Sequence, residues 1–221
     1  DLYAMYQSGK YHDFYTLWKD MSHTRSLNSA KIETLVLLDY FKPFAGGNKI
    51  LKFIAACDAL YERTQFPKDT DSPYIEYIKK CSTTTDKLKT YKDFDYDKAL
   101  REIWDSLPDE PLTISQQLKA QKEYLGYLQY ANPRLATTYH YVLSIDGKYK
   151  NKNITLYRLC DGETLTYKIR PRTLDDNHIE PGEIIKVLDT HTEGKWSKDG
   201  DQWIQSKTDF NDFLTKYFHV R

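Results

Sequence analysis

The hydrophobic pattern of this chain changes period once, and that change limits the fold more than any other feature. Before about Ala136, apolar residues recur at three- and four-residue spacing, which is typical of helices that bury one face. After it, apolar and polar residues alternate in short runs, which is typical of half-buried strands. We therefore predict an α+β protein in which a helical part precedes a small sheet, with the boundary near Ala136.

Apolar stripes predict a series of short helices in the first part. The stripes lie within residues 14–21, 32–38, 50–60 and 99–107. Pro43 and Gly46-Gly47 end the second of these helices. Thr113 and Gln116 have the spacing of a capping box, so we predict a further helix over residues 114–130 with Leu118, Leu125 and Leu128 on its buried side.

Alternating segments predict five short strands, separated by turn signals such as Asp146-Gly147 and Asp161-Gly162. The predicted strands are 139–145, 154–159, 164–169, 183–188 and 202–205. Five short strands in this space are typical of an oligonucleotide-binding (OB-like) barrel, and a small SH3-like barrel is the alternative. Thr208 can cap a C-terminal helix that carries Phe210, Phe213, Leu214 and Phe218.

These elements divide the chain into four predicted parts. They are an all-α helical module over residues 1–66, a helical connector over 67–135, the five-stranded barrel over 136–207 and the C-terminal helix over 208–221. A chain of 221 residues is long enough for two domains with cores of their own.

The composition excludes several classes of protein. The 32 basic and 32 acidic residues cancel, so any nucleic-acid contact must come from local basic faces. The three cysteines are far apart, which argues against a disulfide framework or a zinc ribbon. No apolar run approaches the length of roughly 20 residues that a membrane span needs, and no export signal is visible. We expect a cytoplasmic protein that does not enter a membrane.

Residues Asp93, Asp95 and Asp97 form the only acidic pattern that suggests metal chemistry. Carboxylates at alternate positions of a strand could hold Mg²⁺. A helical apolar pattern follows directly, however, so Asp95 or Asp97 is better interpreted as a helix N-cap or first-turn acid. The histidines are scattered, and no nucleophile motif or phosphate loop is present. We expect no catalytic residue, metal site or cofactor site in this chain.

Two segments resemble a known family. The first runs from Leu35 to Phe41 and continues through Phe44, Gly46 or Gly47, and Asn48; the second is Gln121–Gly126, followed by Asn132-Pro133. Both resemble the region after the palm and fingers in C-family bacterial replicative DNA polymerases, the alpha subunits of DNA polymerase III. The resemblance covers roughly residues 1–64 and 115–190.

The resemblance implies a helix-hairpin-helix module followed by an OB domain. It also implies DNA-directed DNA synthesis by a longer parent protein, with Mg²⁺ bound in a palm that these residues do not include. The implied partners are duplex DNA and single-stranded template, with the sliding clamp or other replisome proteins reached through the parent. The chain would be the DNA-binding part of a nucleotidyltransferase, and it would position template and duplex.

Basic and aromatic residues supply the candidate DNA contacts. In the helical part they are Arg25, Lys31, Lys42, Lys49 and Lys52, which could reach phosphates beside a helix N-terminus. In the barrel they are Lys148, Lys150, Lys152, Tyr157, Arg158, Lys168 and Arg170. Further barrel aromatics, Trp196 and Trp203 among them, offer faces on which bases could stack.

Two other functions fit the same sequence. The chain could be a complete, non-enzymatic nucleic-acid-binding or scaffold protein, or an enzyme whose site forms between the two parts.

Overall fold

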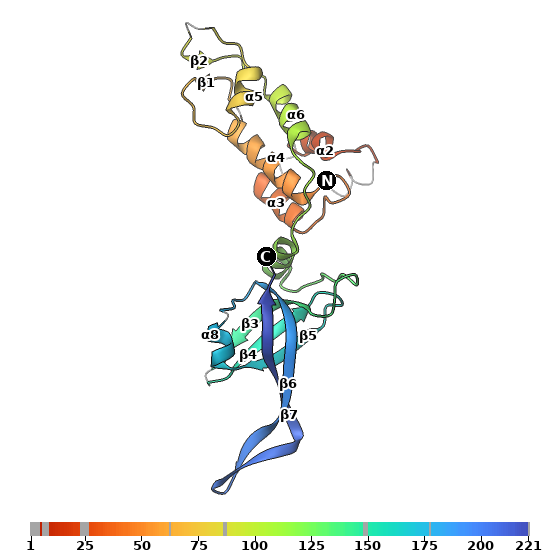
Figure 1. Ribbon diagram of the computed structural model, residues 1–221. Coiled ribbons are helices and arrows are strands. Elements are labelled where there is room, and N and C mark those ends of the chain that lie inside the picture. The colour runs from red at the N-terminus through yellow and green to blue at the C-terminus, as the bar shows by residue number, and fades with distance from the viewer. Residues whose placement is uncertain are drawn as a thin grey trace. The chain divides into compact units, whose positions relative to one another are not determined.

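The computed structural model describes residues 5, 9–22, 27–61, 63–85, 88–147, 150–176 and 178–220 (Figure 1). The chain forms two compact units, Asp1–Ala120 and Gln121–Arg221, which we call the helical unit and the barrel unit. Helices dominate the first and strands the second, which confirms the α+β class. The units divide earlier than the predicted boundary near Ala136, because residues after Ala120 pack on the barrel: the Tyr157 hydroxyl donates to the Tyr130 carbonyl at 2.7 Å.

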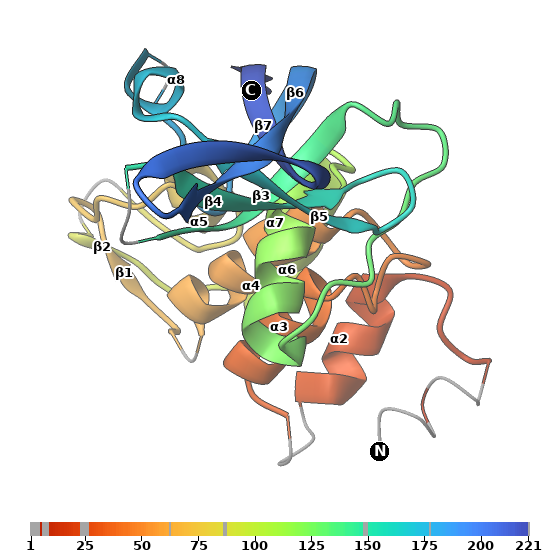
Figure 2. The ribbon, with the colours of Figure 1, turned by 90° about the horizontal axis from the view of Figure 1, so that it is seen from below.

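The helical unit contains six helices and one small two-stranded sheet among its described residues. Their bounds are α2 (Phe14–Ser22), α3 (Ser29–Leu37), α4 (Gly47–Leu60), β1 (Phe66–Pro67), α5 (Ile75–Lys80), β2 (Thr90–Tyr91), α6 (Tyr96–Ser106) and α7 (Ile114–Ala120). Helix α4 packs against α3 and α6 (Figures 1 and 2). The predicted apolar stripes are the buried faces of α2, α3, α4 and α6, so these four helices are confirmed.

One aromatic core holds this unit together. The ring of Phe14 in α2 stacks on Trp104 in α6 at 5.8 Å, and Phe53 in α4 meets Trp104 edge to face at 5.2 Å. The same buried cluster runs from Phe14 to Trp104. Residues 1–66 and 67–135, which the sequence suggested as separate parts, therefore both contribute to one core, in a unit that ends at Ala120.

Gly46 and Gly47 allow residues 109–112, which we call the strap, to lie on the N-terminus of α4. The amides of Asn48 and Lys49 donate to the Glu110 carbonyl, at 3.0 and 3.4 Å. A Cβ atom at Gly46 would collide with that carbonyl, and one at Gly47 would collide with the side chain of Leu112. The glycine pair thus permits a close backbone approach rather than a free turn.

The predicted capping box is confirmed, but the helix after it is shorter than predicted. The Thr113 amide donates to Gln116 Oε1 at 2.8 Å, and the Gln116 amide donates to Thr113 Oγ1 at 3.2 Å. Helix α7 ends at Ala120, and a π-helical turn, Gln121–Leu125, follows it. Gly126 then adopts φ +79°, a left-handed conformation that ends the helix, and Leu125 is exposed instead of buried.

The described residues of the barrel unit form five strands, β3 (Tyr139–Asp146), β4 (Lys152–Arg158), β5 (Thr164–Ile169), β6 (Ile184–Asp199) and β7 (Gln202–His219). The short helix α8, Pro171–Asp176, joins β5 to β6. The strands close in the order β3-β4-β5-β7-β6, with β6 pairing back to β3. Strands β5 and β7 pair in parallel, and the other four pairings between these strands are antiparallel. The core inside this ring is aliphatic apart from Tyr217.

The predicted C-terminal helix over 208–221 is wrong, because residues up to His219 form strand β7. Strand β7 also contains a β-bulge. The register skips Thr215, since Thr190 pairs with Leu214 and Asp189 pairs with Lys216. The predicted apolar face of this helix is wrong as well, since Phe213 and Leu214 are buried whereas Phe210 and Phe218 are exposed.

In the described part of the chain, no helix is long and apolar enough to cross a membrane.

Candidate nucleic-acid interface

The longest exposed feature of the barrel unit is a β-hairpin formed by the ends of β6 and β7. Its outer part, Gly194–Phe210, extends beyond the barrel (Figure 1), and we call it the arm. The residues on either side of its turn, 195–205, are all exposed. Gly194 lies opposite an irregular stretch of β7, and a Cβ atom there would collide with the Ser206 carbonyl, so a glycine is required for the two strands to approach.

Two tryptophans share one face of the arm. Trp196 pairs with Gln205, and Lys198 pairs with Trp203, in an antiparallel register. Directly opposed residues point to the same side, and so do alternate residues along a strand, so these four side chains share a face. Trp196 is 56% exposed and Trp203 is 64% exposed. Such exposure leaves both indole rings available to a partner.

Charges on the arm are close to balanced. Lys195 forms an ion pair with Asp209 at 2.8 Å, and Lys198 lies 4.0 Å from Asp201. Ion pairs at this exposure contribute little to stability. The arm therefore presents aromatic surface with one cation beside it, rather than a strongly basic surface.

Four of the predicted barrel contacts lie on the β4–β5 side of the barrel. Lys150 and Lys152 are exposed near the start of β4, and Lys168 is half-buried in β5. Arg170 follows β5 and forms an ion pair with Glu193 of β6 at 3.0 Å. Its guanidinium also lies over the ring of Phe213, 4.9 Å from the centroid.

Tyr157 and Arg158 are not available as predicted. Tyr157 is 7% exposed, and its hydroxyl is used by the Tyr130 carbonyl. Arg158 holds Asp161 in a two-atom contact and also pairs with Glu163. The guanidinium beside Asp161 lowers the pKa of that carboxyl to about 2. Both residues serve the barrel's own structure here, so we remove them from the set of candidate contacts.

Three predicted lysines of the helical unit are engaged by other groups, one of them local in sequence and two distant. Lys42 pairs with Asp39 at 3.1 Å and Lys52 with Glu110 at 2.5 Å, while the Lys49 ammonium lies over the Trp104 ring at 4.4 Å. Lys31 is exposed on α3.

The N-terminus of α4 is also occupied by the chain itself. Beside the Glu110 carbonyl described above, the Asp109 carboxylate accepts from the Gly46 amide at 2.6 Å. A phosphate at this helix end would have to displace the strap, so the helix N-terminus is not an open anion site as the sequence suggested.

Two predicted contacts, Arg25 and Lys148, lie outside the described residues.

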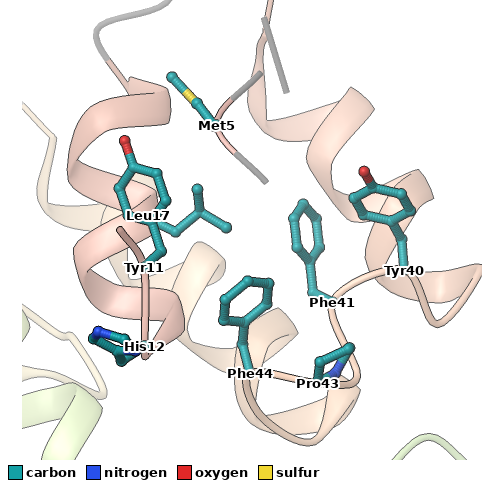
Figure 3. A pocket seen from close by; sticks show the side chains of 8 residues that line it. All are labelled: Met5, Tyr11, His12, Leu17, Tyr40, Phe41, Pro43 and Phe44. Atoms are coloured by element: carbon teal, nitrogen blue, oxygen red, sulfur yellow. The ribbon is translucent and has the colours of Figure 1, made fainter. Parts of the chain in front are cut away.

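The helical unit also contains an apolar cavity of about 290 Å³ (Figure 3). In Figure 3 the rings of Phe41 and Phe44, from the turn after α3, point toward Tyr11 and Leu17. Met5 closes one side, and the residues on both sides of Met5 are outside the described ranges. Among the described residues that line this cavity, charged groups of the kind that phosphate binding needs are not clustered.

Asp95 is the N-cap of α6, as one of the two interpretations predicted. Its side chain accepts from the Lys98 amide at 3.0 Å. Among residues 5, 9–22, 27–61, 63–85, 88–147, 150–176 and 178–220, no three His, Cys, Asp or Glu side chains are grouped to hold a metal ion.

Comparison with known proteins gives no further assignment: no family model, no curated protein and no solved structure matches this chain.

Proposed function

We propose that the barrel unit binds single-stranded DNA through the arm, as the template-guiding part of a C-family replicative DNA polymerase. The order of the strands supports an OB-like barrel. The first strand, β3, pairs with both the second and the fourth, and the fifth runs parallel to the third. Barrels of this type bind oligonucleotides with the loops that join strands one to two and four to five. The arm is the connection between strands four and five.

The observation that carries the proposal is the pair of exposed tryptophans on one face of the arm. Stacking of a base on an aromatic ring contributes about 1–3 kcal/mol, and it tolerates any sequence because every base has a flat face. Lys198 lies on the same face, where its ammonium can approach a phosphate. The arm can therefore hold a strand without reading its sequence.

The charge of the arm sets how binding should respond to salt. A contact that releases few counterions weakens only moderately as salt rises. Since the arm carries paired charges, most of its contribution should come from stacking. Lys150, Lys152 and Lys168 would supply the phosphate contacts elsewhere on the barrel.

The proposal predicts that the double variant W196A/W203A loses most of its affinity for single-stranded DNA. Removing two stacking rings should weaken binding by about 30-fold or more. The measurement is anisotropy of a labelled oligonucleotide of about 16 nucleotides, the upper site size of one such barrel, with the full chain at two salt concentrations.

The matched control is Phe218→Ala, which removes another exposed aromatic from β7 outside the arm. It should bind like the wild type. An equal loss of affinity in the control and in the double variant would contradict a specific role for the arm. If the wild type binds neither single-stranded nor primer-template DNA at about 50 mM salt, DNA binding itself is wrong. The non-enzymatic scaffold function would then remain.

A further inference from the structure

A pocket of about 330 Å³ lies at one end of the barrel, which we call the barrel-mouth pocket. Its walls come from the start of β3, the end of β4, the start of β5 and the base of β6. The lining residues used below are Thr138, His140, Arg158, Leu165, Tyr167 and Thr190.

His140 gives the pocket a buried hydrogen-bond acceptor. The side chain is 3% exposed, and its Nδ1 lies 2.9 Å from the Thr138 carbonyl oxygen. A carbonyl can only accept, so Nδ1 carries the proton and Nε2 presents a lone pair. In the part of the chain that the structure describes, no donor reaches Nε2 or the buried Thr138 Oγ1. Buried polar atoms left in this state are rare and costly, which points to an occupant that supplies the missing donor.

The other walls restrict the chemistry of that occupant. Leu165 and Tyr167 offer apolar surface, which suits a flat, uncharged ring. Arg158 is already held by Asp161 and Glu163, so the pocket has no cation free to attract a phosphate or carboxylate through this residue. A planar ring with an N–H donor fits both conditions, and a nucleobase has this chemistry.

Strand β6 connects the pocket to the arm, because it carries both Thr190 and Trp196. Thr190 lines the pocket and pairs with Leu214, whose side chain is in the barrel core. Alternation along β6 carries the same face through Thr192 to Gly194, where the pairing with β7 shifts register before Trp196. A strand that stacks on the arm would thus reach the barrel mouth by following β6.

We propose that the barrel-mouth pocket receives one base of the bound strand and that His140 Nε2 accepts a hydrogen bond from an N–H group of that base. This inference rests on the proposed function, because it assigns a second contact to the same strand. The shared chemistry, a ring with an N–H donor, could also come from a free nucleoside.

The test follows the ring nitrogens of His140 by long-range ¹H–¹⁵N spectroscopy of the full chain. Oligo(dC), whose bases carry an amino donor, should shift the Nε2 resonance and leave that of Nδ1 nearly unchanged. An abasic oligonucleotide of equal length should not shift it. Deoxycytidine alone tests the second source: a shift with the nucleoside and none with oligo(dC) would overturn the assignment to a bound strand.

Two variants provide an independent measurement. His140→Phe removes the acceptor and should weaken binding of oligo(dC) about tenfold. Thr190→Trp places a ring at the mouth from an exposed position, and it should weaken binding to a similar extent. If both variants bind oligo(dC) like the wild type while W196A/W203A does not, the base pocket is wrong and the proposed function stands. If no variant and no wild-type chain binds DNA, both are wrong.

Discussion

At the scale of single residues, the structure distinguishes basic side chains that other groups of the protein engage from those that remain available to a ligand. Lys49 and Lys52 both follow the glycine pair and had the same predicted role. Their partners, Trp104 and Glu110, are more than fifty positions away in sequence, so no local pattern could reveal them. The packing of α4 against α6 and against the strap decides which lysines can reach a ligand.

His140 shows the same limit for a buried group. Its neighbours in sequence suggest only a strand position, and its value as an acceptor depends on the closed ring around it. Burial lowers the pKa of His140, and the positive charge of Arg158 lowers it further, although the Thr138 carbonyl and the Asp161 carboxylate act in the opposite direction.

The lowered pKa predicts how the stability of the barrel depends on pH. An unfolded histidine has a pKa near 6.5, so below about pH 6.5 the unfolded chain binds a proton that folded His140 resists. Stability from this group is present above that pH and is lost as the pH falls. The loss should reach at most about 1.4 kcal/mol per pH unit.

Urea unfolding at about pH 7.5 and 5.5 measures this effect, with the unfolding free energy of His140→Gln as the reference. The difference between wild type and variant should shrink or change sign at the lower pH. A constant difference would show that His140 does not resist protonation.

At the scale of elements, local rules worked where the signal lies within a few residues. The capping box of Thr113 and Gln116 and the N-cap at Asp95 depend on neighbours three positions apart, and both were predictable. Strand β7 was not predictable, because a bulge changed the spacing of its buried residues. A bulge depends on the register with β6, which lies outside the local sequence. The arm was missed for the same reason, since a helix was predicted where β7 returns from it.

The cap at Asp95 supports a quantitative prediction. Asp95→Ala should destabilise the helical unit by about 1 kcal/mol, because the Lys98 amide loses its acceptor. Asp95→Asn keeps an acceptor and should lower the stability of the helical unit much less. Urea unfolding followed by far-ultraviolet circular dichroism compares the two, and equal losses would mean that the charge, rather than the hydrogen bond, is what matters.

At the scale of the whole molecule, the described residues form two hydrophobic cores that share no side chain. The change of period near Ala136 was enough to predict two parts and a mixed fold. The ring order of the barrel was not predictable, because closure depends on pairing between β3 and β6, whose paired residues are 43 to 47 positions apart. The DNA-binding role itself stays a prediction.

Separate cores predict separate folding. Fragments 1–120 and 121–221 should each give a cooperative thermal transition by scanning calorimetry, at temperatures near those of the corresponding transitions in the full chain. A fragment that stays unfolded alone would show that its unit depends on the other.

The four tryptophans divide between the units by burial as well as by position. Trp18 and Trp104 are enclosed in the helical core, whereas Trp196 and Trp203 stand in solvent on the arm. Selective excitation of indole should therefore yield two emitting populations in the native protein. An aqueous quencher such as acrylamide would first reach Trp196 and Trp203, whose emission is red-shifted by the solvent around them. The arm and the helical core can therefore be followed separately by intrinsic fluorescence, without any added label.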